Sequence, residues 1–486
     1  MGALVNESAP SRIAPRLWPR RLLNRLEIDQ AVFFAIAARG WQFLAGPLTV
    51  ILIGKFFSAE VQGYYYTFWS LIALQTVFDF SFHPVIVNFA SHEWGAGGQA
   101  MARHARAGAA VGGDSASQSH QIATQRLASL LRGSLVGYAI VAVIFLLVVG
   151  GAGLAFFAFG QASDTLAWRA PWLALVALTA LTFWTTPWLA MLEGCDEVKS
   201  VYHLQFTRAV VGNLVVWALI PLGAALWVPA AAAAVRLVCE AIWIVAKHRD
   251  FFSTLLRQPR GARVDWWGEV WPFQWRVGLR GLLGFANTFL INPVVFLYHG
   301  EVAAGQLGMT WQILTSLQAA CMSWLKTKTA KLGMLVSSGQ FAELDRIYFR
   351  LLWISGTFLA LGCAAFVLLV FGLNQFDWSL AGRMLPTLPT AVLAVAIVLL
   401  IIPESQWTYI HAHKKSPHLG LAVLGAVLSA VLIVKLGHDW GASGVIVAYF
   451  TMIVAFYLPL WSAVWWSCRA RWHAEPERLL VDREAP

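Results

Sequence analysis

Two arginines fall inside long segments of the chain that are otherwise apolar. Arg39 lies in AVFFAIAARGWQFLAGPLTVILIG, which covers residues 31–54, and Arg280 lies in a second apolar segment that begins near Trp271. A charged side chain inside a membrane costs free energy, so its presence there suggests a functional role. A guanidinium group can bind two phosphate oxygens at once through its planar donors. The two arginines therefore predict a binding site for an anionic ligand that carries phosphate.

Arg276 precedes Arg280 by four residues, so the two positions share one face of a helix. Arg39 and Arg280 each lie about nine residues into their segments, which is ~13 Å at the helical rise of about 1.5 Å per residue. If the two halves of the chain pack around a shared axis, the three arginines converge on a central cavity. The alternative is that their side chains extend to the lipid headgroups, which is easier for Arg276 than for Arg39 or Arg280.

Uncharged polar side chains repeat along the same apolar segments. We predict Gln42 and Asn287 as substrate-binding residues, because amides bind hydroxyl groups, as a sugar would require. Buried amides also bridge helices to one another, and this alternative stays open. The whole set consists of Gln42, Gln75, Gln274, Asn287, Asn292, Gln312 and Gln318.

Four further ionisable residues lie in apolar segments. Arg236 and Glu240 are four residues apart, so they predict an ion pair within one helix. Asp79 and Glu404 could each pair with an arginine, bind a coupling cation (H⁺ or Na⁺) or titrate with a proton. Glu404 follows Pro403, where a broken helix would leave carbonyl groups free to coordinate. We expect no other cofactor.

The composition places all these residues in a membrane. Of 486 residues, 58% are hydrophobic and only 12% are charged, with a mean hydropathy of +0.63. Soluble domains have about 25% charged residues. The apolar runs are continuous over about 20 residues and do not alternate, which predicts helices and not a barrel. The expected fold class is an all-α polytopic membrane protein, and the net charge of +10 reflects membrane topology and not nucleic-acid binding.

Hydropathy predicts twelve transmembrane helices, at 31–54, 64–90, 133–159, 170–192, 205–227, 229–246, 271–298, 302–325, 347–372, 387–410, 418–436 and 441–467. With the N-terminus in the cytoplasm, the outside loops hold only four basic residues, namely Lys55, Arg169, Arg383 and Lys435. The positive-inside rule therefore puts both termini in the cytoplasm. The five cysteines predict no disulfide and no metal site, because none lies in an outside loop and no two are closely spaced.

A weak internal repeat relates the two halves of the chain. Internal repeats of this kind are common in transporters. We therefore expect two six-helix lobes related by a pseudo-two-fold axis along the membrane normal. The matching residues are Arg39-Gly40 with Arg280-Gly281, Glu60-Val61 with Glu301-Val302, and Gly63 with Gly305 after a slip of one residue.

The predicted organisation follows from the repeat and the charges. The interlobe linker carries Arg and Trp, which suits a segment that lies on anionic membrane lipids, or an ordinary solvated linker. The units are a basic N-terminal segment (1–30), an N-lobe (31–246) with a mobile inside loop (91–132), the linker (247–270), a C-lobe (271–467) and a cytoplasmic tail (468–486).

The order of these features resembles a known family. The stretch FFSAEVQGYYYTFWSLIALQTVFDFSFHPVIVNFASHEW (56–94), followed by a basic inside loop that ends in QRLASLLR, is similar to bacterial polysaccharide transporters of the oligosaccharide flippase (Wzx-like) type. These belong to the multidrug/oligosaccharidyl-lipid/polysaccharide (MOP) exporter superfamily. The similarity is strongest over about residues 32–132, and the Gly- and Ser-rich stretch at 108–120 departs from the family pattern.

The resemblance implies a function. Such flippases move an isoprenoid-pyrophosphate-linked oligosaccharide from the inner to the outer leaflet of the bacterial cytoplasmic membrane, for surface polysaccharide biosynthesis. Their product goes to polysaccharide polymerase machinery. Central arginines of the first and seventh helices are thought to hold the pyrophosphate, and the matching residues here are Arg39 and Arg280, with Arg276 beside them.

Three alternatives compete with this interpretation. A cation-coupled multidrug exporter of the same superfamily would bind cationic drugs through membrane carboxylates, and the excess of arginine argues against it. A polysaccharide polymerase usually needs a sizeable basic outside loop, and the outside loops here are short. A scaffold for a polysaccharide assembly complex would tolerate loss of Arg39 and Arg280. The chain shows no enzyme signature, such as a phosphate-binding Gly-rich loop or an HExxH motif.

Overall fold

The structure is a computed structural model that describes residues 30–107, 113–159, 166–259, 261–272, 274–275, 278, 289–376, 378, 380–413 and 419–484. These residues form helices and short connections, with no strand among them. The all-α fold class predicted from the sequence is confirmed.

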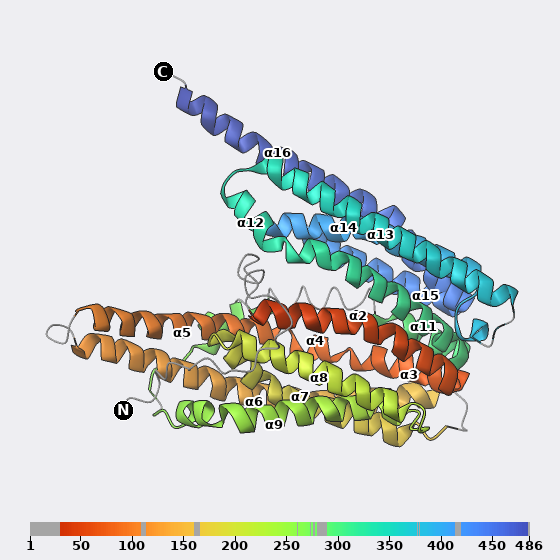
Figure 1. The fold of residues 1–486 in the computed structure, drawn as a ribbon, viewed down its shortest axis with the longest axis horizontal. Helices are drawn as coiled ribbons and strands as arrows, with labels where there is room; N and C mark the ends of the chain where they lie inside the picture. Colours follow the sequence, from red (N-terminus) through yellow and green to blue (C-terminus); the bar gives the residue numbers. More distant parts are fainter. Residues whose placement is uncertain are drawn as a thin grey trace, which may run out of the picture.

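The helices form two layers (Figure 1). The first layer contains α2 (Gln30–Phe56), α3 (Ala59–Ile72), α4 (Gln75–Asp79), α5 (Phe82–Ala107), α6 (Gly113–Phe159), α7 (Arg169–Gly194), α8 (Val198–Leu219) and α9 (Trp227–Leu256). The second layer contains α11 (Ile291–Thr327), α12 (Thr329–Ser337), α13 (Phe341–Gln375), α14 (Thr387–Ala412), α15 (Leu419–Thr451) and α16 (Leu458–Glu484). We call these layers the N-lobe and the C-lobe.

Three short elements complete the described part of the chain. A π-helical turn, η1 (Trp266–Val270), lies in the connection between the lobes. A 3₁₀ turn, η2 (Ala381–Arg383), precedes α14. A second π-helical segment, η3 (Met452–Tyr457), joins α15 to α16 without a loop.

Seven helical stretches of the described chain are long and apolar enough to cross a membrane, at 59–96, 120–159, 169–194, 227–256, 341–375, 387–412 and 420–473. They include the predicted spans at 418–436 and 441–467 in one run, because α15 bends at Gly441 (φ 60°) and continues through η3 into α16. The predicted spans at 31–54 and 302–325 lie on α2 and α11, whereas the span predicted at 205–227 extends past the end of α8 at Leu219 into the turn before α9. The chain is a polytopic membrane protein, as its composition predicted.

The predicted span at 64–90 is not one continuous helix. It is divided into α3, α4 and α5, and Phe80 and Ser81 between α4 and α5 adopt positive φ angles of 44° and 57°. Such angles are strained for residues other than glycine. Pro84 lies in the first turn of α5, where its missing N–H costs no helical hydrogen bond.

Helices occupy most of the segment that we expected to be a mobile inside loop. In the region 91–132, α5 continues to Ala107 and α6 begins at Gly113. Together they form a helical hairpin that extends beyond the rest of the N-lobe (Figure 1). Residues 113–120 of the Gly- and Ser-rich stretch form the first turns of α6, and residues 108–112 lie outside the described residues.

The connection between the lobes is attached to the N-lobe. Helix α9 continues to Leu256, so the predicted linker at 247–270 begins inside a helix. The following residues are bound by side chains of α6: Arg132 donates to the carbonyls of Leu256 (2.7 Å) and Gln258 (2.6 Å), and Arg126 pairs with Glu269 (2.6 Å). The linker up to η1 therefore belongs structurally to the N-lobe.

The lobes meet where α3 crosses α11 and diverge away from that contact (Figure 1). Gly63 lies directly against the backbone of α11, since a Cβ atom built on it would lie 1.9 Å from the Glu301 carbonyl oxygen. A Cβ on Gly305 would lie 3.0 Å from the Gly63 nitrogen. Gly63 and Gly305 are matched by the sequence repeat, and matched residues touch each other when they lie on a two-fold axis.

Candidate functional site

Helix α3 lies at the contact between the two lobes and forms one wall of the cavity described below. Residues at its start stabilise its first turn. Ser58 caps the helix, because its Oγ accepts a hydrogen bond from the Val61 nitrogen at 3.2 Å. Glu60 in the first turn suits the positive end of the helix dipole. In the C-lobe, α11 is interrupted at Gly300 (φ 81°), directly before Glu301. The two repeated Glu-Val pairs therefore each follow a break in a helix.

A side-chain clamp holds the crossing of α3 and α11. Gln62 is buried, and its Nε2 donates to the carbonyl oxygens of Gly305 and Arg383, both at 2.9 Å. Asn292 and Thr67 form a further hydrogen bond between the two helices, 3.0 Å long. These contacts close one end of the space between the lobes.

A cavity of about 350 Å³ lies between α2, α3, α8 and α11. This volume is within the range of small-molecule sites, about 300–1,000 Å³. Its apolar side consists of Ala45, Val50 and Ile53 of α2. Its aromatic and polar side consists of Thr49, Tyr65, Tyr66, Trp69, Asn213, Gln312 and Ser316. None of the described residues that line the cavity is charged.

Two polar groups in the cavity wall have no hydrogen-bond partner within the described part of the chain. The Tyr66 hydroxyl is buried and unpaired, and Asn213 takes part in no hydrogen bond there. Other wall groups are paired with each other: Thr49 accepts from Trp217 Nε1 (2.9 Å), and Gln312 donates to Ser316 (3.0 Å). A buried unpaired hydroxyl is unfavourable. The Asn213 amide is a polar contact that the protein leaves unused, and the Tyr66 hydroxyl, which is covered in this conformation, would become a second one if the wall shifted.

The predicted arginine site is only partly covered by the structure. Arg39 and Gln42 lie on α2, but the described residues do not include their side chains. Arg276, Arg280 and Asn287 lie outside the described residues. Gln274 is described and buried, and its Nε2 lies 3.4 Å from the Phe80 carbonyl oxygen, which links the start of the C-lobe to the break between α4 and α5.

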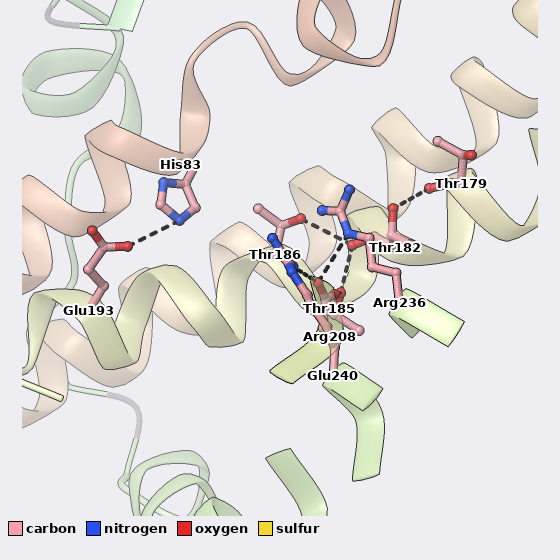
Figure 2. A network of polar contacts seen from close by, with 9 residues as sticks. All are labelled: His83, Thr179, Thr182, Thr185, Thr186, Glu193, Arg208, Arg236 and Glu240. Carbon is pink, nitrogen blue, oxygen red and sulfur yellow. Dashed lines mark hydrogen bonds and ion pairs between the residues drawn. The ribbon is translucent and has the colours of Figure 1, made fainter. Parts of the chain in front are cut away.

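A second polar group lies inside the N-lobe, and none of its residues lines the cavity (Figure 2). Glu240 of α9 is fully buried and accepts hydrogen bonds from Arg236 Nε (3.1 Å), from Arg208 of α8 and from Thr185 of α7 (2.5 Å). The spacing of Arg236 and Glu240 predicted this pair. The sequence did not indicate that Arg208 and Thr185 join it, although Arg208 is also an arginine in an apolar segment.

Thr185 belongs to a run of threonines on α7. The hydroxyls of Thr179, Thr182 and Thr185 donate to backbone carbonyls three or four residues earlier, at 2.7–2.8 Å. This arrangement satisfies each hydroxyl in an apolar environment without a partner from another helix. Only Thr185 also reaches a carboxylate. The group around Glu240 is therefore a hydrogen-bonded ion cluster with two arginines and one glutamate.

Asp79 and Glu404, the two predicted coupling carboxylates, lie in different lobes. Asp79 ends α4, and its Oδ1 accepts a hydrogen bond from the Tyr138 hydroxyl at 2.6 Å. Nearby, His83 Nε2 lies 3.5 Å from Glu193 (Figure 2). Glu404 lies on α14 and interacts with Lys326 of α11. Neither carboxylate lines the cavity.

The residues of the cavity wall were mostly missed by the sequence argument. Gln312 was noted as a polar residue in an apolar segment, but Asn213, Tyr66 and Trp69 were not. The YYYTFW run after Gly63 contains the aromatic part of the wall, but the sequence pattern does not indicate that these side chains face a cavity. Only the packing of α3 against α2 and α11 reveals it.

A scan against protein-family models and a search of curated proteins found no match for this chain. Among solved structures, the chain is similar to the lipid II flippase MurJ in an inward closed conformation, with a TM-score of 0.60 and 13% identity over 89% of this chain and 87% of that one. It is also similar to the MATE multidrug transporter DinF-BH, with a TM-score of 0.57 and 14% identity over 90% of this chain and 95% of that one.

A third similar structure is a MOP superfamily transporter from Pyrococcus furiosus, with a TM-score of 0.54 and 15% identity over 92% of this chain and 96% of that one. At these identities the similarity concerns the fold. The chain thus shares its helical fold with these transporters over most of its length.

Proposed function

We propose that this protein is a flippase that moves a polyprenyl-pyrophosphate-linked oligosaccharide across the bacterial cytoplasmic membrane by alternating access. The main support for the proposal is the cavity between the lobes, because it is lined in part by α2, the helix that contains Arg39. The similarity in fold to a lipid II flippase agrees with a lipid-linked substrate. We propose that the protein acts without enzymatic chemistry, and that its product feeds the polymerases of a surface polysaccharide.

The register of α2 connects the arginine to the cavity. Gly46 and Thr49 line the cavity, and Arg39 and Gln42 precede them by seven residues each. Seven residues make about two turns of a helix, so these four positions form one stripe. In the proposed mechanism, Arg39 binds the pyrophosphate together with Arg280 and Arg276, and the head group extends along the stripe. The lipid tail stays in the bilayer.

The experiment is glycolipid mass spectrometry on a deletion strain, with the sidedness of the glycolipid determined in spheroplasts. We expect the lipid-linked oligosaccharide to accumulate in the inner leaflet. Wild type should relieve the accumulation, and Arg39→Ala and Arg280→Ala should not. Loss of a charged hydrogen bond of about 1.5–3 kcal/mol corresponds to a rate about ten- to a hundredfold lower.

Lys55→Ala is the matched control, because Lys55 is a basic residue at the end of the same helix and its amine lies over the ring of Phe56 at 5.4 Å. It should complement like wild type when expressed at the same level. Outer-leaflet accumulation of single repeat units would identify a polymerase and overturn the proposal. Full complementation by both arginine variants would leave a scaffold as the better account.

The second candidate function is cation-coupled drug export, and the fold shared with multidrug transporters favours it. Such a protein needs a free carboxylate. Glu240 does not fit, because two arginines already pair with it. Asp79 and Glu404 are the carboxylates to test for H⁺ or Na⁺ coupling. Broad sensitivity of the deletion strain to cationic drugs, without glycolipid accumulation, would establish this function in place of the first.

A further inference from the structure

We infer that the cavity between α2, α3, α8 and α11 binds an uncharged sugar ring of the transported head group. The inference rests on the proposed function and adds to it the part of the substrate that this cavity recognises. Arg39 and its partners bind the pyrophosphate in the proposed mechanism, and the cavity lies about two helical turns farther along α2.

The aromatic wall suits the apolar face of a sugar ring. Tyr65 and Trp69 are four residues apart on α3 and therefore lie on one face of the helix, with Tyr66 beside them. The Trp69 side chain is 39% exposed, so its ring is accessible to a ligand. Aromatic rings with a few well-placed polar groups are typical of small-molecule sites.

The polar wall suits hydroxyl groups. Tyr66 is 7% exposed, and its covered hydroxyl has no partner among the described residues, so it can pair with a ligand when the wall shifts. The Asn213 amide and the carbonyl end of Gln312 add both donors and acceptors. An isoprenoid tail would leave all these groups unpaired. A ring that carries hydroxyl or acetamido groups would pair them.

Because the described lining residues carry no charge, the cavity favours an uncharged sugar over an ionised one. An ionised carboxylate in this cavity would lose water without gaining a cation from those residues. Arg208 and Arg236 are bound to Glu240, and the proposed mechanism assigns Arg39 to the pyrophosphate, so none of the three is left for a second anion. With the arginines assigned in this way, the inference is that the ring in the cavity is neutral and that acidic sugars of the repeat unit lie elsewhere.

The test is saturation-transfer difference NMR on the full chain in lipid nanodiscs of phosphatidylethanolamine and phosphatidylglycerol, free of glycoside detergent. The probes are two neutral disaccharides, N,N′-diacetylchitobiose and lactose, and one acidic disaccharide, digalacturonate. Tetraphenylphosphonium serves as a competing lipophilic cation. The variants are Trp69→Ala, Tyr66→Phe and Trp184→Ala.

We expect saturation transfer to at least one neutral disaccharide and none to digalacturonate. Trp69→Ala should abolish the transfer. Tyr66→Phe should weaken binding about three- to tenfold, the worth of one hydrogen bond. It should leave folding intact, because the hydroxyl bonds to no described group. Trp184→Ala removes an exposed tryptophan of α7 outside the cavity and should bind like wild type.

Three results would overturn the inference: equal transfer to digalacturonate, no transfer to either neutral disaccharide, or transfer that Trp69→Ala leaves unchanged. Displacement of the sugar by tetraphenylphosphonium would instead assign the aromatic wall to cations. The glycolipid assay of the deletion strain separates this test from the proposed function. If that strain accumulates inner-leaflet glycolipid but the purified protein binds no sugar, only the cavity assignment fails.

Discussion

Glu240 shows how one residue can organise three helices. Its carboxylate receives hydrogen bonds from α7, from α8 and from its own helix α9 (Figure 2). A buried ion pair gives little net stability by itself, but removal of one partner leaves a buried charge without compensation. Two arginines and one carboxylate also leave the cluster with an excess positive charge, and Arg236, which is 40% exposed, can place part of it near solvent or headgroups.

We predict that Glu240→Gln lowers the free energy of unfolding by about 3–5 kcal/mol, because Arg208 and Arg236 would then repel each other without a carboxylate between them. The measurement is an unfolding titration with SDS, followed by tryptophan fluorescence. Glu193→Gln is the control, since Glu193 pairs only with the half-exposed His83. It should cost less than about 1 kcal/mol. Equal effects of the two substitutions would show that the Glu240 cluster has no special role.

The sequence predicted local pairs at the residue scale and missed the non-local ones. Arg236 and Glu240 could be paired from their spacing, because four residues make about one turn of a helix. Arg208 is far from Glu240 in the chain, and nothing in the sequence specifies that α8 packs beside α9. The same holds for Tyr138, which reaches Asp79 from α6. Such partners become visible only when the helix packing is known.

At the scale of elements, the close crossing of α3 and α11 depends on glycines, which have no side chain, at Gly63 and Gly305. Gly63 allows the two backbones to touch, and Gln62 then reaches carbonyl oxygens on the C-lobe. The sequence repeat indicated Gly63 and Gly305 as equivalent positions, but it did not say that they meet. The breaks between α3, α4 and α5 were not predicted either, because Phe80 and Ser81 are not residues that usually adopt positive φ angles.

We predict that Gly63→Ala separates the lobes at this crossing, because its Cβ would overlap the Glu301 carbonyl and backbone atoms cannot rotate away. The measurement is the distance between spin labels at Leu222→Cys and Trp378→Cys, two exposed positions on the N-lobe and the C-lobe. The distance distribution should shift to longer values. Gly137→Ala on α6, where a Cβ meets nothing within 4 Å, should leave it unchanged. An unchanged distribution in Gly63→Ala would exclude this account of the crossing.

At the scale of the whole molecule, the lobes diverge from the α3–α11 contact toward the end that carries the α5–α6 hairpin (Figure 1). The charge distribution of the sequence predicts that this end faces the cytoplasm. The proposed flippase needs this orientation, because its lipid-linked substrate is made on the cytoplasmic side. Orientation in the membrane is not a property of the fold alone, so it requires its own measurement.

We predict that a membrane-impermeant maleimide labels Gln118→Cys only in inverted vesicles and Leu222→Cys only in spheroplasts. Both side chains are exposed, one near the start of α6 and the other between α8 and α9. The background is a variant without the five native cysteines, which form no disulfide. It must complement the deletion strain to be valid. The opposite labelling pattern would reverse the topology and would contradict export from the cytoplasm.

The length of α6 has a consequence for the surroundings of the protein. Its 47 residues span about 70 Å at ~1.5 Å per residue, and a tilt of about 40° shortens this only to ~54 Å. A bilayer with its headgroups is about 40–45 Å thick. The α5–α6 hairpin therefore projects beyond the membrane on one side of the molecule. Atomic force microscopy can image this projection. Any assembly that approaches on this side meets the hairpin before it meets the transmembrane body.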